Sequence, residues 1–160
     1  MKKSLIALVA LAVTTAAMLA LSGPASGAGV TQVSGLGTFP DPGEGYCTEV
    51  VARDADYWIN LEGDLEGCVY GFVAEAKFVE GAGVSKITGY EIFVGCWEEM
   101  CGRFDMDGSI HSKDGAFGFC VHPIVTGSGT DDFAGITGRL DFRDDLVADN
   151  APYTGHLKLG

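Results

Sequence analysis

The sequence predicts an all-β protein, a small antiparallel barrel of about seven to eight strands held by disulfides. Apolar residues recur at every second position in one segment after another between Tyr57 and Leu159. No segment of comparable length has helical spacing, and 24 glycines suit turns and bends. One apolar face per strand must be covered without helices, so we expect the sheet to close on itself, which also removes unpaired edges. Two packed sheets are the alternative that the pattern leaves open.

Residues 1–28 have the pattern of a secretory signal peptide. Lys2 and Lys3 precede an apolar run from Leu5 to Leu21, and small residues follow up to Ala28. We expect cleavage after Ala28, with Gly27 as a close competitor and an uncleaved anchor helix as the alternative. The predicted location is therefore secreted, either extracellular or periplasmic, with no membrane anchor after cleavage.

The remaining 132 residues, 160 less the 28 of the leader, suffice for one domain. Residues 29–56 are expected to form a Gly-rich, partly ordered lead-in, and residues 57–160 the barrel domain. Without Lys2 and Lys3, eight basic residues face 22 acidic ones, a net charge of −14. Such a charge disfavours nucleic acid and anionic membranes as partners. Oligomeric state cannot be read from a strand pattern.

The strands are expected in a fixed order along the chain. The first has an alternating pattern from Tyr57 to Leu65, and the second places Tyr70, Phe72 and Phe78 on one apolar face. The later alternating segments are residues 89–95, 103–107, 117–125, 136–142 and 153–159. Aromatic residues on the assumed inner faces are the candidate ligand-binding residues, namely Tyr70, Phe72, Tyr90, Phe104, Phe117 and Phe119.

The five cysteines all follow the predicted leader, at positions 47, 68, 96, 101 and 120. Their spacing does not fit a structural zinc site, which normally has two close ligand pairs, so no metal is expected. Cys96 and Cys101 are interpreted as a staple across a hairpin, and Cys68 with Cys120 as the second pair. Cys47 is then left over. It could instead take one of those partners, stay free or join two chains.

Polar residues that could face the interior are few. Glu91 shares a strand face with Phe93, so its environment is ambiguous, and a solvent or rim position is the simpler interpretation. His122 shares its face with Cys120 and suits the interior. His122 and Glu91 are the candidate catalytic residues, although a core histidine is the simpler interpretation of His122. Glu75 shares the face of Lys77 and suits a solvated outer pair. No hydrolase, kinase, dehydrogenase or metalloprotease motif occurs, so no cofactor is expected.

Three segments resemble elements of bacterial proteins with an allene oxide cyclase-like barrel, and dirigent proteins carry a similar glycine-rich turn. They are Leu61 to Gly67 (LEGDLEG), Glu91 to Gly95 (EIFVG) and Gly127 to Gly138 (GSGTDDFAGITG). The chain departs from the pattern at Asp131, where a glycine is usual, but aspartate can adopt the left-handed conformation. The resemblance implies a calycin-like antiparallel barrel with a cavity, and it implies little about chemistry.

Two functional classes follow from these expectations. In the first, the protein is a secreted noncatalytic barrel whose interior binds a small apolar ligand or whose surface serves interaction. In the second, it is a cyclase or isomerase that controls the conformation of a hydrophobic substrate inside the cavity. The absence of convergent polar groups in the sequence, the export signal and the acidic exterior favour the first class.

Overall fold

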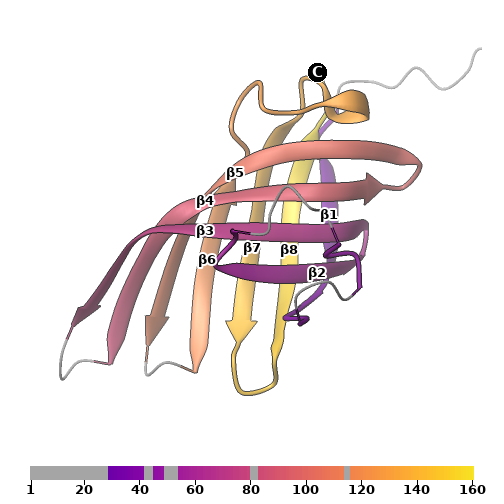
Figure 1. Cartoon of the computed structure of the whole chain (residues 1–160). Coiled ribbons are helices and arrows are strands. Elements are labelled where there is room, and N and C mark those ends of the chain that lie inside the picture. The colour runs from indigo at the N-terminus through magenta and orange to yellow at the C-terminus, as the bar shows by residue number, and fades with distance from the viewer. Residues whose placement is uncertain (1–28, 42–44, 49–53, 80–82, 114–115) are drawn as a thin grey trace, which may run out of the picture.

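The computed structural model describes residues 29–160 apart from 42–44, 49–53, 80–82 and 114–115. The predicted signal peptide therefore lies outside the described residues. Eight antiparallel strands form a closed barrel in which each strand pairs with its sequence neighbours and the last strand pairs with the first (Figure 1). This confirms the predicted all-β barrel and rules out the alternative of two packed sheets. In the part of the chain that is described, no helix is long and apolar enough to cross a bilayer.

The strands follow one another around the barrel with a short 3-10 helix between the sixth and the seventh. They are β1 (Thr31–Thr38), β2 (Tyr57–Gly63), β3 (Leu65–Val79), β4 (Val84–Trp97), β5 (Met100–Lys113), β6 (Phe117–Pro123), η2 (Asp131–Phe133), β7 (Thr137–Asp145) and β8 (Asn150–Lys158).

Strand β1 lies inside the segment assigned to the lead-in. It pairs with β8 along its whole length, from Thr31 opposite Leu157 to Thr38 opposite Asn150, and it also pairs with β2. The barrel therefore begins at Thr31 and not at Tyr57. This strand is rich in glycine and short polar residues, which is why its alternation is too weak to find from the sequence.

A β-bulge in β3 exchanges the two faces of that strand. The pairing of β3 with β4 shifts between Val73 and Glu75, so Ala74 has no partner. Val69 packs in the barrel core before the bulge, and Phe78 lines the interior after it. The expectation that Tyr70 and Phe78 share one inner face is wrong, because one extra residue reverses the direction of every later side chain.

The β6–β7 loop (residues 124–136) closes one end of the barrel (Figure 1). Its 3-10 helix η2 inserts Phe133, which is fully buried, with its ring centroid 5.4 Å from that of Phe104 and 6.1 Å from that of Phe93. Asp131 has φ +54°, so the aspartate does occupy the left-handed position where a glycine was usual. This end of the barrel is therefore a packed aromatic core.

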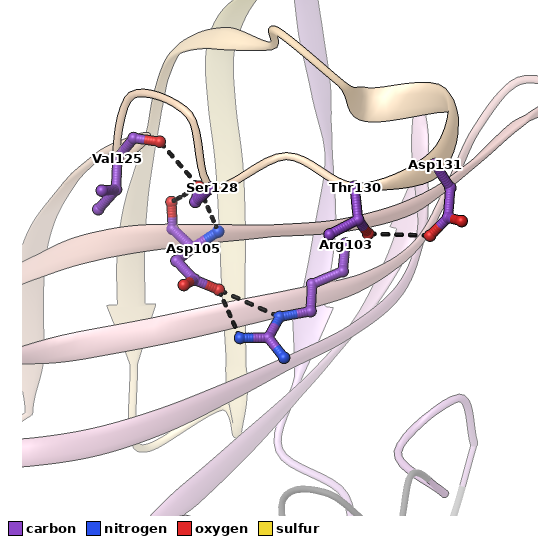
Figure 2. A network of polar contacts seen from close by, with 6 residues as sticks. All are labelled: Arg103, Asp105, Val125, Ser128, Thr130 and Asp131. Carbon is purple, nitrogen blue, oxygen red and sulfur yellow. Dashed lines mark hydrogen bonds and ion pairs between the residues drawn. The ribbon is translucent and has the colours of Figure 1, made fainter.

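Hydrogen bonds fasten that loop to β5, and Figure 2 shows the network. The Ser128 hydroxyl donates to the Val125 carbonyl at 2.7 Å and accepts from the Asp105 backbone N–H at 2.9 Å. Next to it, the Arg103 guanidinium donates to Asp105 Oδ1 through two nitrogens, at 3.0 and 3.2 Å. The loop satisfies its backbone groups against the β5 edge and excludes water from Phe133.

Two disulfides are present, and one of them corrects the expected pairing. Cys96 and Cys101 face each other across the β4–β5 hairpin and are bonded, as predicted. The pair Cys68–Cys120 is wrong, because Cys68 bonds Cys47 and Cys120 is a buried free thiol. The reason is that Cys68 points out of the barrel while Cys120 points into it. Cys47 thereby ties the segment after β1 over the outer face of β3, where Tyr70 is buried.

Removal of the hairpin disulfide should have a moderate effect. The double variant Cys96→Ser, Cys101→Ser is expected to lose about 2 kcal/mol of unfolding free energy, because the bond closes only a short loop in the unfolded chain. Urea unfolding followed by circular dichroism measures this loss. A loss above about 4 kcal/mol would show that the bond does more than limit the unfolded chain.

Candidate functional site

A cavity of about 430 Å³ occupies the half of the barrel away from the β6–β7 loop. Its lining comes largely from strand ends that meet there: Phe39 follows β1, Tyr57 begins β2, Phe78 lies near the end of β3 and Leu146 follows β7. The complete lining is Phe39, Tyr57, Ile59, Val73, Phe78, Ser85, Ile87, Glu91, Ile110, Ser112, Gly118, Cys120, His122, Asp144 and Leu146. A volume of this size is typical of small-molecule sites.

The barrel is hollow at this end because its inward residues are small. Ser85, Ser112 and Gly118 stand at positions where larger side chains would fill the interior. At the closed end, in contrast, the inner faces of β4 and β5 carry the large side chains of Phe93 and Phe104. Because side chains fill a barrel of eight strands when they are large enough, the change from aromatic to small residues creates the cavity.

Glycine at position 71 positions Tyr57. The two residues pair between β2 and β3, and a Cβ atom on Gly71 would collide with the Tyr57 ring. The ring therefore lies across the glycine, and this placement brings its hydroxyl to Glu91, which pairs with Gly71 from the other side. The Tyr57 hydroxyl donates a hydrogen bond to Glu91 Oε1.

Glu91 and His122 meet on the inner wall of the cavity. Each side chain is only 1% exposed, and His122 Nε2 lies 3.3 Å from Glu91 Oε1 without the alignment of a hydrogen bond. Cys120 and Asp144 lie beside them, and the Cys120 thiol donates to Asp144 Oδ2 at 3.0 Å. Strands β2, β4, β6 and β7 thus bring a phenol, two carboxyl groups, an imidazole and a thiol into a chamber whose other polar side chains are Ser85 and Ser112.

Burial changes the protonation of both central residues. Desolvation raises the pKa of Glu91 to about 7, with a further increase from the charge of Asp144, although the Tyr57 hydrogen bond opposes it. Desolvation also lowers the pKa of His122 to about 4. The imidazole is therefore neutral at pH 7, so the 3.3 Å contact is not an ion pair there. Glu91 takes up or releases a proton near neutral pH.

Burial also shifts the pKa values of the neighbouring groups. Burial raises the pKa of Tyr57, Cys120 and Asp144, and negative neighbours add to the rise for the phenol and the thiol. Cys120 consequently stays a thiol and not a thiolate, which makes it a poor nucleophile.

Several buried polar atoms in this wall have no hydrogen-bond partner among the described residues. They are Glu91 Oε2, Asp144 Oδ1 and both ring nitrogens of His122. Unpaired buried polar atoms are costly and therefore uncommon in folded proteins. All three side chains belong to the cavity lining, so a ligand whose polar part reaches this wall could pair with these buried atoms.

The structure brings together the two catalytic candidates named from the sequence. His122 lies in the interior, as expected, but the solvent or rim position favoured for Glu91 is wrong. Sequence reasoning missed Tyr57, Cys120 and Asp144 as parts of the same wall. Alternation along β6 could have indicated Cys120, which shares the inner face with His122. Alternation likewise places Asp144 on the face of Leu140 and Phe142 in β7, and Tyr57 on the face of Ile59 and Leu61 in β2.

None of the six candidate ligand-binding aromatics lines this cavity. Phe72 and Tyr90 stack on the outer surface with ring centroids 4.6 Å apart, and Tyr70 is buried outside the barrel wall. Phe104 belongs to the packed core. Phe117 and Phe119 are exposed, because Gly118, Cys120 and His122 occupy the inner face of β6. Five of the six side chains therefore point out of the barrel, contrary to the expected inner faces, and only Phe104 points inward as expected.

Glu75 forms a 3.0 Å ion pair with Lys77 on the outer surface, as expected. Within the described ranges, no group of three or more histidine, cysteine, aspartate or glutamate side chains is arranged to hold a metal ion. On β5, the Asp105 carboxylate accepts from Arg103, and the Asp105 backbone N–H donates to Ser128 of the β6–β7 loop.

Comparison with known proteins adds no family name. No protein-family model matches the chain, and no curated protein matches it. The fold and the cavity are therefore the basis for a functional assignment.

Proposed function

We propose that this protein is a noncatalytic binding protein that holds a small apolar molecule in the barrel cavity. The observation that supports this most strongly is the cavity itself, about 430 Å³ in volume and lined largely by apolar side chains. The packed aromatic core around Phe133 fills the opposite end of the barrel, so we expect a ligand to enter at the cavity end. Burial of apolar ligand surface against such a wall supplies the binding free energy.

The surroundings of the cavity mouth support this proposal. Phe78 is 75% exposed and Val147 is 80% exposed, and Val79, Val84 and Leu146 are also exposed there. Neighbouring exposed apolar residues often mark a binding site. Phe78 and Leu146 both line the cavity and reach solvent, so an apolar molecule can pass from the rim to the interior without leaving apolar contacts.

Export and family membership are parts of the same proposal. Two disulfides suit an oxidising compartment, which supports secretion after loss of the leader. The resemblance of the glycine-rich turn supports a place among the allene oxide cyclase-like or dirigent-like barrels. Mass spectrometry of the mature N-terminus tests export, because a mature chain that begins at Gly29 is the expected product.

A single substitution should test whether the cavity binds apolar molecules. Ile87→Trp is expected to weaken binding of the neutral dye N-phenyl-1-naphthylamine at least about tenfold, because the indole would fill space that the dye needs. Lys86→Trp is the matched control, since Lys86 is the preceding residue of β4 and points to solvent. Fluorescence titration measures both. Equal affinities in the two variants, or no binding by the wild type, would overturn the proposal.

Native mass spectrometry of protein purified from its own host supplies an independent test. We expect a bound apolar compound that dissociates on denaturation. The Ile87→Trp variant purified in the same way should carry none.

The second candidate function is a cyclase or isomerase acting on a hydrophobic substrate. The convergence of Tyr57, Glu91 and His122 in an apolar chamber favours it, because Glu91 can exchange a proton near pH 7. Incubation of the extracted ligand with wild type, Glu91→Gln and His122→Ala tests it. Conversion by wild type and not by the variants would establish an enzyme, whereas an unchanged ligand in every sample would remove this candidate.

A further inference from the structure

We infer that the ligand of this cavity is an apolar amine that binds as its cation. This inference rests on the proposed binding function and names its ligand class. Its basis is the set of polar groups in the cavity wall, which holds two carboxyl groups, Glu91 and Asp144, and no lysine or arginine among the described lining residues. The other titratable groups there are Tyr57, Cys120 and His122.

The unpaired atoms in the wall are complementary to an ammonium group. Within the described part of the chain, no donor reaches the buried oxygens Glu91 Oε2 and Asp144 Oδ1, and a neutral His122 offers one more acceptor nitrogen. An alkylammonium carries three N–H donors and no acceptor, whereas an alcohol donates only one hydrogen bond. Hydrogen bonds between charged partners are also roughly twice as strong as neutral ones. The wall can therefore satisfy an ammonium group more fully than a hydroxyl.

Electrostatics separates amines from fatty acids even more clearly. A carboxylate ligand would place another acidic group next to the carboxyl groups of Glu91 and Asp144 in a weakly screened interior. An ammonium would instead favour the ionised form of both side chains, which burial alone disfavours. The acidic surface acts in the same direction, since it attracts cations and repels anions.

A matched series of eight-carbon ligands tests this inference. Isothermal titration calorimetry with octylamine, 1-octanol and octanoate at pH 8 should show octylamine binding at least about tenfold tighter than octanol, with octanoate weakest. Glu91→Gln and Asp144→Asn should each remove most of the octylamine advantage and leave octanol affinity within about twofold. Glu75→Gln is the control, because it removes the same charge from an exposed outer position.

Octylamine affinity should also fall by about tenfold between pH 8 and pH 6. Glu91, with its pKa of about 7, gains a proton over this range while the amine remains protonated. The groups that face Glu91 from the other strands do not reverse this trend. His122 has a pKa of about 4 and stays neutral, burial keeps Tyr57 and Cys120 protonated, and Asp144 can only add a protonation of the same sign.

The outcomes separate this inference from the proposed function. If octanol and octylamine bind equally and Glu91→Gln changes neither affinity, the inference of an amine ligand is rejected. The proposed function, binding of an apolar molecule, would then still stand. Tightest binding of octanoate would also overturn it. If none of the three ligands binds and the neutral dye does not bind either, both the inference and the proposed function fail.

Discussion

Replacement of Phe104 by alanine is expected to lower the free energy of unfolding by about 4 kcal/mol. Phe104 is fully buried at the closed end, where its ring centroid lies 4.9 Å from that of Phe93 and 5.4 Å from that of Phe133. The loop that carries Phe133 is fixed by hydrogen bonds to β5, so it cannot easily move inward to fill the space. Urea denaturation with both disulfides intact measures the loss.

Phe119→Ala is the matched control for this prediction. Phe119 is 61% exposed on β6, so the same truncation should change stability by less than about 1 kcal/mol. Phe104→Ala should also leave the affinity for N-phenyl-1-naphthylamine unchanged under conditions in which the variant is folded, because Phe104 does not line the cavity. A loss below about 2 kcal/mol would mean that the closed end is loosely packed, contrary to the structure.

Substitution of Glu91 by glutamine should change how stability depends on pH, by an amount on the order of 3 kcal/mol. The pKa of Glu91 is raised from 4.5 in the unfolded chain to about 7 in the fold. The folded state therefore holds a proton that the unfolded state has lost between these values. The stability that the protonated Glu91 side chain contributes is fully present below pH 4.5 and is lost as the pH rises through 7. Glutamine does not titrate and keeps an oxygen for the Tyr57 hydroxyl.

The stability of Glu91→Gln relative to wild type should thus increase between pH 4.5 and pH 8. Denaturant midpoints at several pH values measure this difference, and Glu75→Gln is the control that removes a carboxylate from an exposed outer position. His122 contributes in the opposite sense and should remain visible in the variant. Its pKa is lowered from 6.5 to about 4, so the stability it supports is lost as the pH falls from 6.5 to 4. A difference between Glu91→Gln and wild type that stays constant with pH would contradict burial of the carboxyl group.

The fold class could be predicted because it depends on local patterns. Alternation of apolar residues indicates strands wherever one face is buried, and glycines indicate where the chain turns. The hairpin disulfide was predictable for the same reason, since Cys96 and Cys101 are close in the sequence and face each other across one turn. The left-handed Asp131 followed from the conformational range of aspartate.

The candidate site was only partly accessible to such reasoning. His122 could be placed inside from its neighbours on β6, but the face of Glu91 depended on which side of β4 meets the core. On β4 both sides carry apolar residues. Ile92 packs on the outer face in the cluster that contains Cys47, while Phe93 packs inside the barrel. Alternation cannot distinguish two apolar faces, and this accounts for the exposed position assigned to Glu91.

By itself, the sequence pattern determined that the chain forms antiparallel strands and few helices, because the spacing of side chains along each strand is a local property, whereas the choice of a barrel over two packed sheets rested on the resemblance of the glycine-rich turn. Tertiary structure alone decided that Cys68 pairs with Cys47, that a bulge at Ala74 turns Phe78 inward, and that Tyr57, Glu91, His122 and Asp144 share one wall. Closure of the barrel sets these relations, since it fixes which faces point inward and brings together strands far apart in the chain.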